Sequence, residues 1–497
     1  MTSKQIAAFM CSLFTKTSGN IRLLDPGAGV GSLTAAFVDY ACSQDASPRE
    51  IQATAYEVDA LLASYLGDTL EECADRARSQ RIKFSSRLKI ADFIHDGAEQ
   101  SYSLFNTRRT FTHVVMNPPY KKISSNSAHR LSLRRAGIET SNLYAGFLAL
   151  SALLLEDGGE LVAITPRSFC NGPYFLPFRK MFLERMTLKH IHVFEERNKA
   201  FSEDDVLQEN VIFHVVKGAD KSRVTISVSS DSEFSDYSSR EVDYAQIVNP
   251  DDPELFIHMA SSTEDDRTAE RIKTFHHSLQ DLGVSVSTGP VVDFRLKDLL
   301  RQEPVTDSVP LVYPGHCRNN FVEWPVDGRK PNAILDTEES NRWLMPNGYY
   351  TLVKRFSAKE EKRRISASLH DPKRVEGQLI GFENHLNVFH ANKNGLQETL
   401  AKGLAVYLNS TLVDAYFRQF NGHTQVNAAD LRKLRYPSRK QLVSLGESVN
   451  GHFPEQETVD SLIEGLELEA TLDKQGRRKN KTGAGNSGAS GTSSRAA

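Results

Sequence analysis

The chain has 497 residues, of which 60 are Lys or Arg and 63 are Asp or Glu. The net charge of −3 excludes a protein whose whole surface is cationic, but nucleic-acid binding depends on where the charges lie. The five cysteines form no C-x-x-C pair, and no apolar run reaches the about 20 residues that cross a bilayer. We therefore expect a cytoplasmic protein of roughly two or three domains, with no disulfide framework, no bound metal and no membrane partner.

Residues 1–230 alternate short apolar runs with stretches of helical spacing. The runs predicted as strands are Ile21–Leu24, Ala53–Glu57, His113–Met116, Glu160–Thr165, His190–Phe194 and Val211–Val216. Between them, residues 32–42 and 144–155 place apolar side chains at helical spacing. This alternation is typical of an α/β fold with a doubly wound, mostly parallel sheet.

The remaining residues differ in composition from this first domain. Residues 231–270 hold twelve acidic residues against two arginines, which we interpret as an acidic connector. From 271 to 440 the alternation is lost and Gly, Pro and Asn recur, which predicts a second domain of mixed α+β structure. A C-terminal helical segment at 441–473 and a disordered, basic tail at 474–497 complete the predicted organisation.

The first predicted strand runs directly into a glycine-rich turn, Asp25-Pro26-Gly27-Ala28-Gly29-Val30-Gly31, and a helical pattern follows. Such a turn brings backbone close to a ligand at the carboxyl edge of a sheet. It lacks the lysine of a P-loop and is one residue short of the G-x-G-x-x-G dinucleotide fingerprint. Its D-P-G-A-G-x-G form resembles the cofactor motif of S-adenosylmethionine (AdoMet)-dependent methyltransferases.

That resemblance implies a Rossmann-like methyltransferase sheet and a cofactor site at its edge. The acidic residue of the turn would lie near the methionine amino group, and the glycines would let backbone approach AdoMet. A carboxylate that ends the second strand can accept both ribose hydroxyls, and the segment 89–93 resembles the element whose Asp contacts the adenine amine and whose Phe packs on the ring. The implied cofactor-binding residues are Asp25, Gly27, Gly29, Gly31, Glu57, Asp92 and Phe93.

A strand pattern at 112–116 ends in the tetrapeptide Asn117-Pro118-Pro119-Tyr120. Its prolines fix φ, and Pro118 confines Asn117 to extended conformations. The Asn117 side-chain oxygen and the Pro118 carbonyl can accept the two N–H groups of an adenine amine, and Tyr120 can stack on the base. The tetrapeptide therefore suits methyl transfer to nitrogen by positioning and electrostatic preorganisation, and we predict Asn117, Pro118 and Tyr120 to be catalytic.

The chain resembles the N6-adenine-specific DNA methyltransferases of type II restriction–modification systems with the gamma motif order. In that order the cofactor motif precedes N-P-P-Y and a target-recognition domain follows, here expected at 271–440. Segments 143–147 and 158–169 also fit, and Phe201 lies roughly where relatives stack an aromatic ring on the flipped base. The resemblance implies AdoMet as cofactor, double-stranded DNA as substrate with the target base flipped out, a separate cognate restriction endonuclease, and a monomer or weak dimer.

The N-terminal residues Ser3–Met10 resemble the cofactor-lid motif of the same family. That motif normally reads T-P where this chain has Thr2-Ser3, and relatives usually have further residues before it.

Three basic stretches, 121–135, 353–374 and 418–440, are candidates for phosphate and base contacts. A charge run can also be a solvated face, so the segments predict an interface more firmly than any single residue does. The predicted DNA-binding residues are Lys121, Lys122, Arg130, Lys354, Arg355, Arg432 and Arg435. DNA affinity is expected to fall as salt rises.

Two other functions remain open at this point. N-P-P-Y serves any planar amide or amine, so an N-methyltransferase acting on RNA adenine or on a protein glutamine is an alternative. A non-catalytic DNA-binding protein with a methyltransferase fold is the other, although intact Asp25, Asn117 and Tyr120 argue against it.

Overall fold

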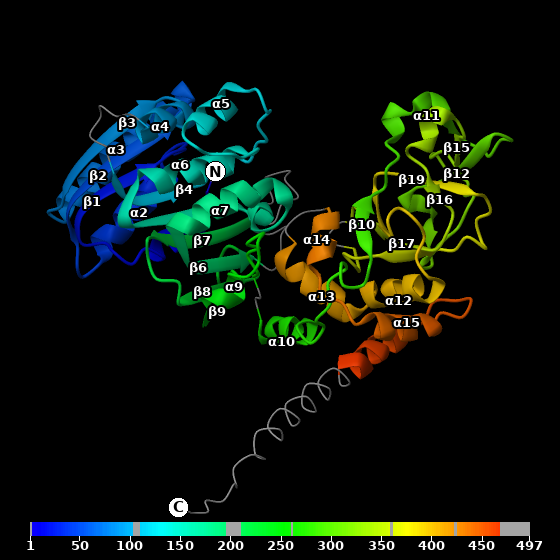
Figure 1. The fold of residues 1–497 in the computed structure, drawn as a ribbon. Coiled ribbons are helices and arrows are strands. Elements are labelled where there is room, and N and C mark those ends of the chain that lie inside the picture. Colours follow the sequence, from blue (N-terminus) through cyan, green and yellow to red (C-terminus); the bar gives the residue numbers. More distant parts are fainter. Residues whose placement is uncertain are drawn as a thin grey trace, which may run out of the picture. The chain divides into compact units, whose positions relative to one another are not determined.

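The computed structural model describes residues 2–102, 110–194, 210–259, 262–357, 361–421 and 425–467. By its contacts the chain divides into two compact units: Met1–Ser262 together with Gln419–His423, and Thr263–Arg418 together with Thr424–Ala497. Figure 1 shows the helices and strands of both units. Among the described residues, no helix combines the length and the apolar character needed to cross a membrane.

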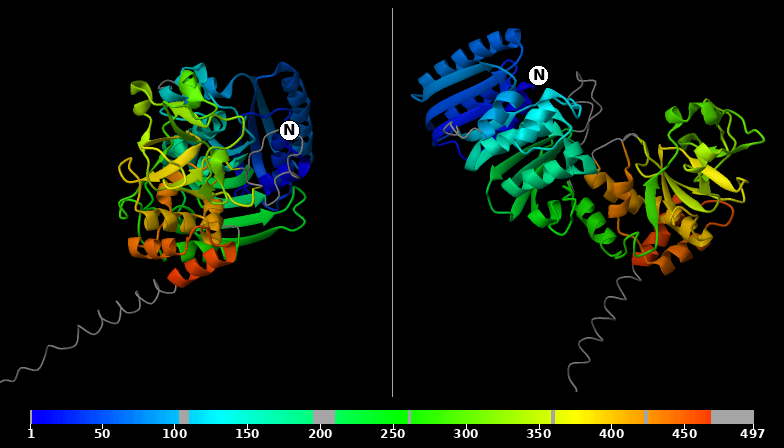
Figure 2. Two further views of the ribbon diagram at one scale, coloured as in Figure 1. Left: turned by 90° about the vertical axis from the view of Figure 1, so that its right-hand side faces the viewer. Right: turned by 45° about the horizontal axis from the view of Figure 1, so that its top comes forward.

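The first unit is organised by a nine-stranded sheet of order β3-β2-β1-β4-β5-β7-β6-β8-β9 (Figures 1 and 2). The first five strands in this order are parallel, and β7 is antiparallel to both of its neighbours. The strands are β1 (Gly19–Asp25), β2 (Pro48–Glu57), β3 (Lys83–Ile90), β4 (Phe111–Met116), β5 (Leu155–Pro166), β6 (Met186–Phe194), β7 (Asn210–Lys217), β8 (Arg223–Ser229) and β9 (Ser238–Asp243).

Helices cover both faces of this sheet. One hydrophobic core joins α1, α2 and α3 to one face, and another joins α4, α6 and α7 to the other. Among the described residues, the α-helices of this unit are α1 (Lys4–Ser12), α2 (Ser32–Ser43), α3 (Ala60–Ser79), α4 (Phe93–Tyr102), α5 (Ala128–Arg135), α6 (Leu143–Leu154), α7 (Leu176–Arg185) and α9 (Tyr244–Ile247).

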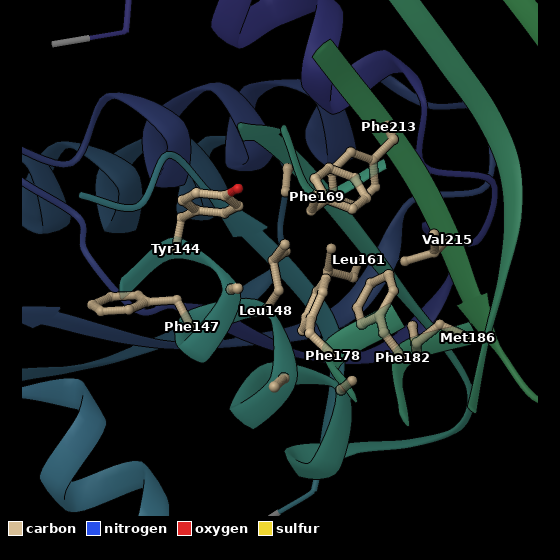
Figure 3. Packing of buried hydrophobic residues seen from close by; sticks show 14 of the residues in the cluster. Tyr144, Phe147, Leu148, Leu161, Phe169, Phe178, Phe182, Met186, Phe213 and Val215 are labelled. Atoms are coloured by element: carbon tan, nitrogen blue, oxygen red, sulfur yellow. The ribbon is translucent and has the colours of Figure 1, made fainter. Parts of the chain in front are cut away.

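Strand periodicity explains how one sheet supports two cores. Successive side chains of a strand point to opposite faces. Leu161 and Ala163 of β5 accordingly belong to the α4/α6/α7 core, whereas Val162 and Ile164 belong to the α1/α2/α3 core. Figure 3 shows Leu161 among the rings of Phe169, Phe178, Phe182 and Phe213 in the first of these cores. Strands buried on both faces read as continuous apolar runs, which is why the sequence pattern located them.

The second unit contains two smaller sheets and a group of helices. The sheets have the strand orders β10-β20-β17-β18-β14-β13 and β11-β15-β12-β19-β16. The strands are β10 (Ser285–Thr288), β11 (Leu300–Arg301), β12 (Ser308–Val312), β13 (Cys317–Arg318), β14 (Phe321–Val322), β15 (Ala333–Leu335), β16 (Met345–Pro346), β17 (Tyr350–Lys354), β18 (Ala367–His370), β19 (Leu379–Phe382) and β20 (Leu386–His390). The labelled α-helices are α10 (Thr263–Ile272), α11 (Glu338–Asn341), α12 (Glu398–Leu408), α13 (Thr411–Phe420, whose last two residues group with the first unit), α14 (Ala428–Lys433) and α15 (Arg439–Glu447), and residues 456–467 are also helical.

The predicted fold class is confirmed: an α/β doubly wound sheet is followed by a mixed α+β unit. All six predicted strands are present, but the sequence pattern missed β3, β8 and β9. Strands β3 and β9 lie at the two edges of the sheet, and most of their side chains are exposed or only half buried, so they contain no apolar run.

The residues predicted as an acidic connector are largely part of the first unit. Strand β9 and helix α9 lie within 231–270, and the unit continues to Ser262 instead of ending at 230. Part of the polar composition of 231–270 comes from β9, an edge strand and not a connector. Strand β9 pairs with β8 at the edge of the sheet, and Val242 is its one buried residue.

Candidate active site

The candidate site lies at the edge of the sheet where the parallel strands β1, β2, β3 and β4 end. Their registers pair Asp25 with Ala55, Glu57 with Ile90, and Leu24 with Val114. The carboxyl ends of the four strands therefore meet at one edge, which brings the glycine-rich turn, Glu57, Asp92 and Asn117 to the same side of the sheet.

The glycine-rich turn leads from β1 into α2 and is shaped by two residues in the left-handed region. Gly29 has φ +57°, and Gly31 has φ +89°. A Cβ at Gly31 would lie 2.8 Å from a Leu66 methyl of α3, whereas a Cβ at Gly29 would have no atom within 4 Å. Gly31 thus permits close packing of α3, and Gly29 exposes backbone to open space where a ligand can approach.

Asp25 ends β1 and is almost completely buried, with 1% of its surface exposed. Its Oδ2 accepts a hydrogen bond from the Thr34 hydroxyl at 2.8 Å, but its buried Oδ1 has no hydrogen-bond partner in the described structure. Burial raises the pKa of Asp25 to about 7, although the hydrogen bond from Thr34 opposes this shift. A buried carboxylate with one unsatisfied oxygen is suited to receive a cationic donor.

Glu57 at the end of β2 faces the glycine-rich turn. Its Oε2 accepts from the Gly29 backbone N–H at 2.9 Å, and its Oε1 accepts from the Asp59 N–H at 2.9 Å. The apolar side chains of Val58 and Ile90 are more than half exposed at the ends of β2 and β3. Neither residue was predicted from the sequence, although Val58 directly follows Glu57 and Ile90 lies two positions before Asp92.

Asp92 and Phe93 follow β3, and the structure separates their environments. Asp92 is half buried, and its Oδ1 accepts from the Ile94 N–H at 2.8 Å at the start of α4. Phe93 is only 2% exposed, and its ring packs edge-on against Tyr56 with the centroids 5.2 Å apart. Phe93 was predicted to pack on the adenine ring, but in the structure its side chain is buried in the core. Val58 and Ile90 instead provide exposed apolar surface at the ends of β2 and β3.

The tetrapeptide continues β4, and its polar side chains contact each other. The Tyr120 hydroxyl lies within donor distance of Asn117 Oδ1 at 3.0 Å and of the Ile164 carbonyl at 3.3 Å. Asn117 Nδ2 donates to the Thr2 hydroxyl at 3.1 Å. The Tyr120 ring meets Tyr144 of α6 edge-on, with centroids 6.3 Å apart. Thr2, which precedes α1, is thus part of the site, and only its place in the cofactor-lid motif pointed to it.

The predicted DNA-binding residues lie in both units, and they differ in exposure and in whether the structure pairs them with another group. Lys121 and Lys122 are exposed directly after Tyr120. Arg130 is instead an ion-pair partner of Glu139, which lies just beyond the basic stretch that contained no acid. In the second unit, Arg355 donates to the Asn384 carbonyl at 3.2 Å. Lys354 is half buried, whereas Arg432 and Arg435 are exposed.

Two features stand apart from these residues. Phe201, predicted to stack on a flipped base, lies outside the described residues. A cavity of about 810 Å³ is lined by Phe9 of α1, His190 of β6 and their neighbours, and none of the predicted site residues borders it.

The fold and the residues at this edge define a methyltransferase with a Rossmann-like sheet. A family model described as Eco57I restriction-modification methylase matches residues 40–201. The chain is 47% identical over 474 residues to the type II methyltransferase M.BsuBI of Bacillus subtilis, covering 94% of this chain and 93% of the relative. It is 44% identical over 467 residues to the type II methyltransferase M.PstI of Providencia stuartii, covering 93% and 91%.

The chain belongs to the type II methyltransferases of restriction–modification systems, and it is a DNA methyltransferase. Among solved structures, the type IIL restriction–modification enzyme MmeI in complex with DNA is similar in fold. That likeness has a TM-score of 0.52 at 12% identity and covers 94% of this chain and 71% of the other. The family membership removes the alternatives of a protein or RNA methyltransferase.

Proposed function

We propose that the protein transfers the methyl group of AdoMet to the N6 amine of an adenine in a specific double-stranded DNA sequence. The observation that carries the proposal is the Asn117–Tyr120 tetrapeptide at the same sheet edge as the buried carboxylate of Asp25. The tetrapeptide suits a planar amine, and the Asp25 carboxylate suits the ammonium group of a methionine moiety.

The residues at the edge fit AdoMet by their chemistry. Asp25 Oδ1 is buried and lacks a hydrogen-bond partner among the described residues, so an ammonium group would satisfy it. Glu57 can accept two ribose hydroxyls, and the exposed Val58 and Ile90 offer apolar surface to an adenine ring. Asp92 can accept from the adenine amine. Bound there, AdoMet would supply an electrophilic methyl group.

The chain's own residues would hold and align the target amine. The lone pair of an adenine amine is delocalised into the ring, so the amine is a weak nucleophile. Two acceptors, Asn117 Oδ1 and the Pro118 carbonyl, would bind its two N–H groups and favour a tetrahedral nitrogen whose lone pair is free. Tyr120 would stack on the base and fix the line of attack. The prolines keep these acceptors rigid.

The adenine must leave the base stack to reach this edge, because its amine is inaccessible within a stacked duplex. We assign the second unit to target recognition, with phosphate contacts from the exposed Lys121, Lys122, Arg432 and Arg435. Phe201 stays a prediction for the second stacking surface. A separate endonuclease that cuts the same unmethylated sequence would be the functional partner.

The test is transfer of labelled methyl from AdoMet into duplex DNA, followed by digestion to nucleosides. The expected product is N6-methyladenine, and label in cytosine would refute the adenine assignment. Modification mapping on DNA from cells that express the protein then gives the target sequence. The Asn117→Ala variant should lose methyl transfer while it keeps AdoMet and DNA binding; unchanged turnover would remove Asn117 from its role.

A further inference from the structure

Helix α5 is docked on the first turn of α4 by two histidines. His129 Nε2 of α5 lies 2.7 Å from Asp92 Oδ2. His95 Nδ1 of α4 lies 2.8 Å from the Ser132 hydroxyl oxygen of α5, and the two imidazole rings stack with centroids 5.1 Å apart. Polar contacts and a ring stack therefore join α5 to the residues that follow β3.

The two carboxylate oxygens of Asp92 have different hydrogen-bond partners. Oδ1 accepts from the backbone N–H groups of Ile94 and His95 at 2.8 and 3.2 Å, and it thereby begins α4. Oδ2 is then the oxygen that remains for a ligand, and His129 shares it. A carboxylate oxygen has two lone pairs, so Oδ2 can accept from His129 and from one further donor at the same time.

Helix α5 belongs to the segment 121–142, which follows Tyr120 directly. Backbone hydrogen bonds close the base of this segment, from Leu143 N to the Lys121 carbonyl and from Ile123 N to the Ser141 carbonyl, both at 2.8 Å. The fully buried Leu133 anchors the helix on α6, where a Cβ at Gly146 would lie 2.9 Å from a Leu133 methyl. Helix α5 and Lys121 therefore belong to one hydrogen-bonded segment that is anchored on α6.

We propose that His129 is a positioning residue that couples AdoMet binding to DNA binding. It holds the Asp92 carboxylate in the orientation that accepts the adenine amine of the cofactor, and it ties that carboxylate to the segment carrying Lys121 and Lys122. This inference rests on the proposed function. Since both ligands favour the docked α5, each tightens the binding of the other, and this coupling is reciprocal.

A metal site is the competing interpretation of the same side chains. Ligand atoms of Asp92, His95 and His129 lie within 4.8 Å of one another. Two ligands of one tetrahedral zinc ion, each bound at about 2.0–2.1 Å, would be about 3.3 Å apart. The 2.7 Å between His129 Nε2 and Asp92 Oδ2 is instead the length of a direct, charge-assisted hydrogen bond.

The first experiment compares two cofactor analogues on the full-length protein. S-adenosylhomocysteine carries the adenine amine, whereas its inosine counterpart carries a carbonyl oxygen at that position. The wild type should prefer the amine ligand, and His129→Ala should lower its affinity for that ligand by about tenfold with little effect on the carbonyl ligand. His129→Gln, which keeps an N–H donor, should recover part of the preference.

The matched control is Leu131→Ala, which truncates an exposed side chain of the same helix. It should leave both affinities unchanged. An equal loss for both analogues in His129→Ala and His129→Gln would indicate a merely structural role and would overturn the proposal.

The second experiment measures the coupling itself. The dissociation constant of a duplex carrying the mapped target is determined with and without saturating S-adenosylhomocysteine. The analogue should tighten DNA binding of the wild type by about fivefold or more, and the factor should approach one in His129→Ala. A factor that the substitution does not change would refute the coupling.

Two further outcomes separate the possible failures. If Asp92→Asn leaves the affinity for S-adenosylhomocysteine unchanged, the adenine assignment of the proposed function fails. If Asp92→Asn weakens that affinity but His129→Ala alters neither the preference nor the coupling, only this inference fails. Chelator treatment and added Zn²⁺ should not change analogue binding; a zinc-dependent change that is lost in His95→Ala would establish the metal site instead.

Discussion

Asn117 and Thr2 are joined by a hydrogen bond of 3.1 Å from the amide Nδ2 to the hydroxyl oxygen. An amide side chain presents a donor nitrogen on one side and an acceptor oxygen on the other. Because Thr2 accepts from the nitrogen, the oxygen is directed towards Tyr120, whose hydroxyl donates to it at 3.0 Å. The segment before α1 therefore fixes the orientation of the Asn117 amide, and under the proposed function this is the orientation in which Asn117 would accept from a substrate amine.

Thr2→Val should lower the rate of methyl transfer by about tenfold, the cost of losing one hydrogen bond that orients a reacting group. The isosteric change removes the acceptor but preserves shape, so affinities for S-adenosylhomocysteine and DNA should remain near wild type. Single-turnover kinetics with saturating cofactor measure the effect. Thr2→Ser keeps a hydroxyl and should retain the rate; equal losses in both variants would contradict the orienting role.

Tyr120 offers a second distinction, between its ring and its hydroxyl. Tyr120→Phe keeps the stacking surface and removes one hydrogen bond, so turnover should stay within about threefold of wild type. Tyr120→Ala removes the ring and should cost about ten- to hundredfold, as expected for loss of base stacking. The rates are compared on the same methylation assay. Equal rates for the two variants would show that stacking by Tyr120 is unimportant.

The buried Asp25 should make cofactor binding depend on pH. Its pKa is about 7 in the folded protein, raised by burial from the 3.8 of a free carboxyl, so it ionises only as the pH approaches neutrality. If the ionised form binds the cofactor ammonium, affinity should rise about eightfold from pH 6 to pH 7.5. Calorimetric titration checks this, and Asp25→Asn should bind weakly with no such rise.

The raised pKa of Asp25 should also make the stability of the folded protein depend on pH. The folded state holds this proton more tightly than the unfolded chain does, so Asp25 contributes stability below about pH 4 that is lost as the pH rises through about 7. Urea unfolding of the ligand-free protein should therefore show a decline over that range that is smaller in Asp25→Asn. A decline of equal size in both proteins would show that Asp25 does not titrate as proposed.

Glu160 in β5 has a lowered pKa, so its effect on the pH dependence of stability is opposite to that of Asp25. Burial alone would raise its pKa, but His214 and the Thr15 hydroxyl and backbone N–H hold it at about 2. Glu160→Gln should lower the free energy of unfolding at pH 7 by about 1–3 kcal/mol, because a fully buried carboxylate loses charge-assisted contacts. The difference should shrink as the pH falls from 4.5 towards 2. Identical urea midpoints at pH 7 would contradict this.

Lys121 and Lys122 should contact phosphates without reading sequence. Replacing both by Ala should weaken binding to all duplexes alike and reduce the slope of log affinity against log salt by about 2. Arg130→Ala is an informative comparison. Because the charge of Arg130 is already paired with Glu139, this substitution should change the slope less than the double lysine variant does. Equal slopes for the wild type and the double variant would exclude these lysines from phosphate contact.

The local motifs of the site could be found from the sequence because backbone geometry encodes them. Glycines at positive φ after one strand and two prolines after another restrict the local backbone, so the sequence pattern selected Gly29, Gly31 and Asn117, which the structure brings to the same end of the parallel strands. The strands buried on both faces were found for a related reason, since their apolar runs need no knowledge of their neighbours. The edge strands β3 and β9 lack such runs and were missed.

What the sequence by itself determined is therefore the α/β class, from the alternation of strand and helix patterns, together with the glycine-rich turn after β1 and the Asn117–Tyr120 tetrapeptide after β4, each of which consists of a few consecutive residues. Only the tertiary structure decided which distant residues meet them. Thr2 reaches Asn117 across 115 positions, and His129 reaches Asp92 across 37. Packing likewise placed Phe93 in the core and paired Arg130 with Glu139. Such contacts depend on how the helices settle on the sheet, and no local pattern specifies that.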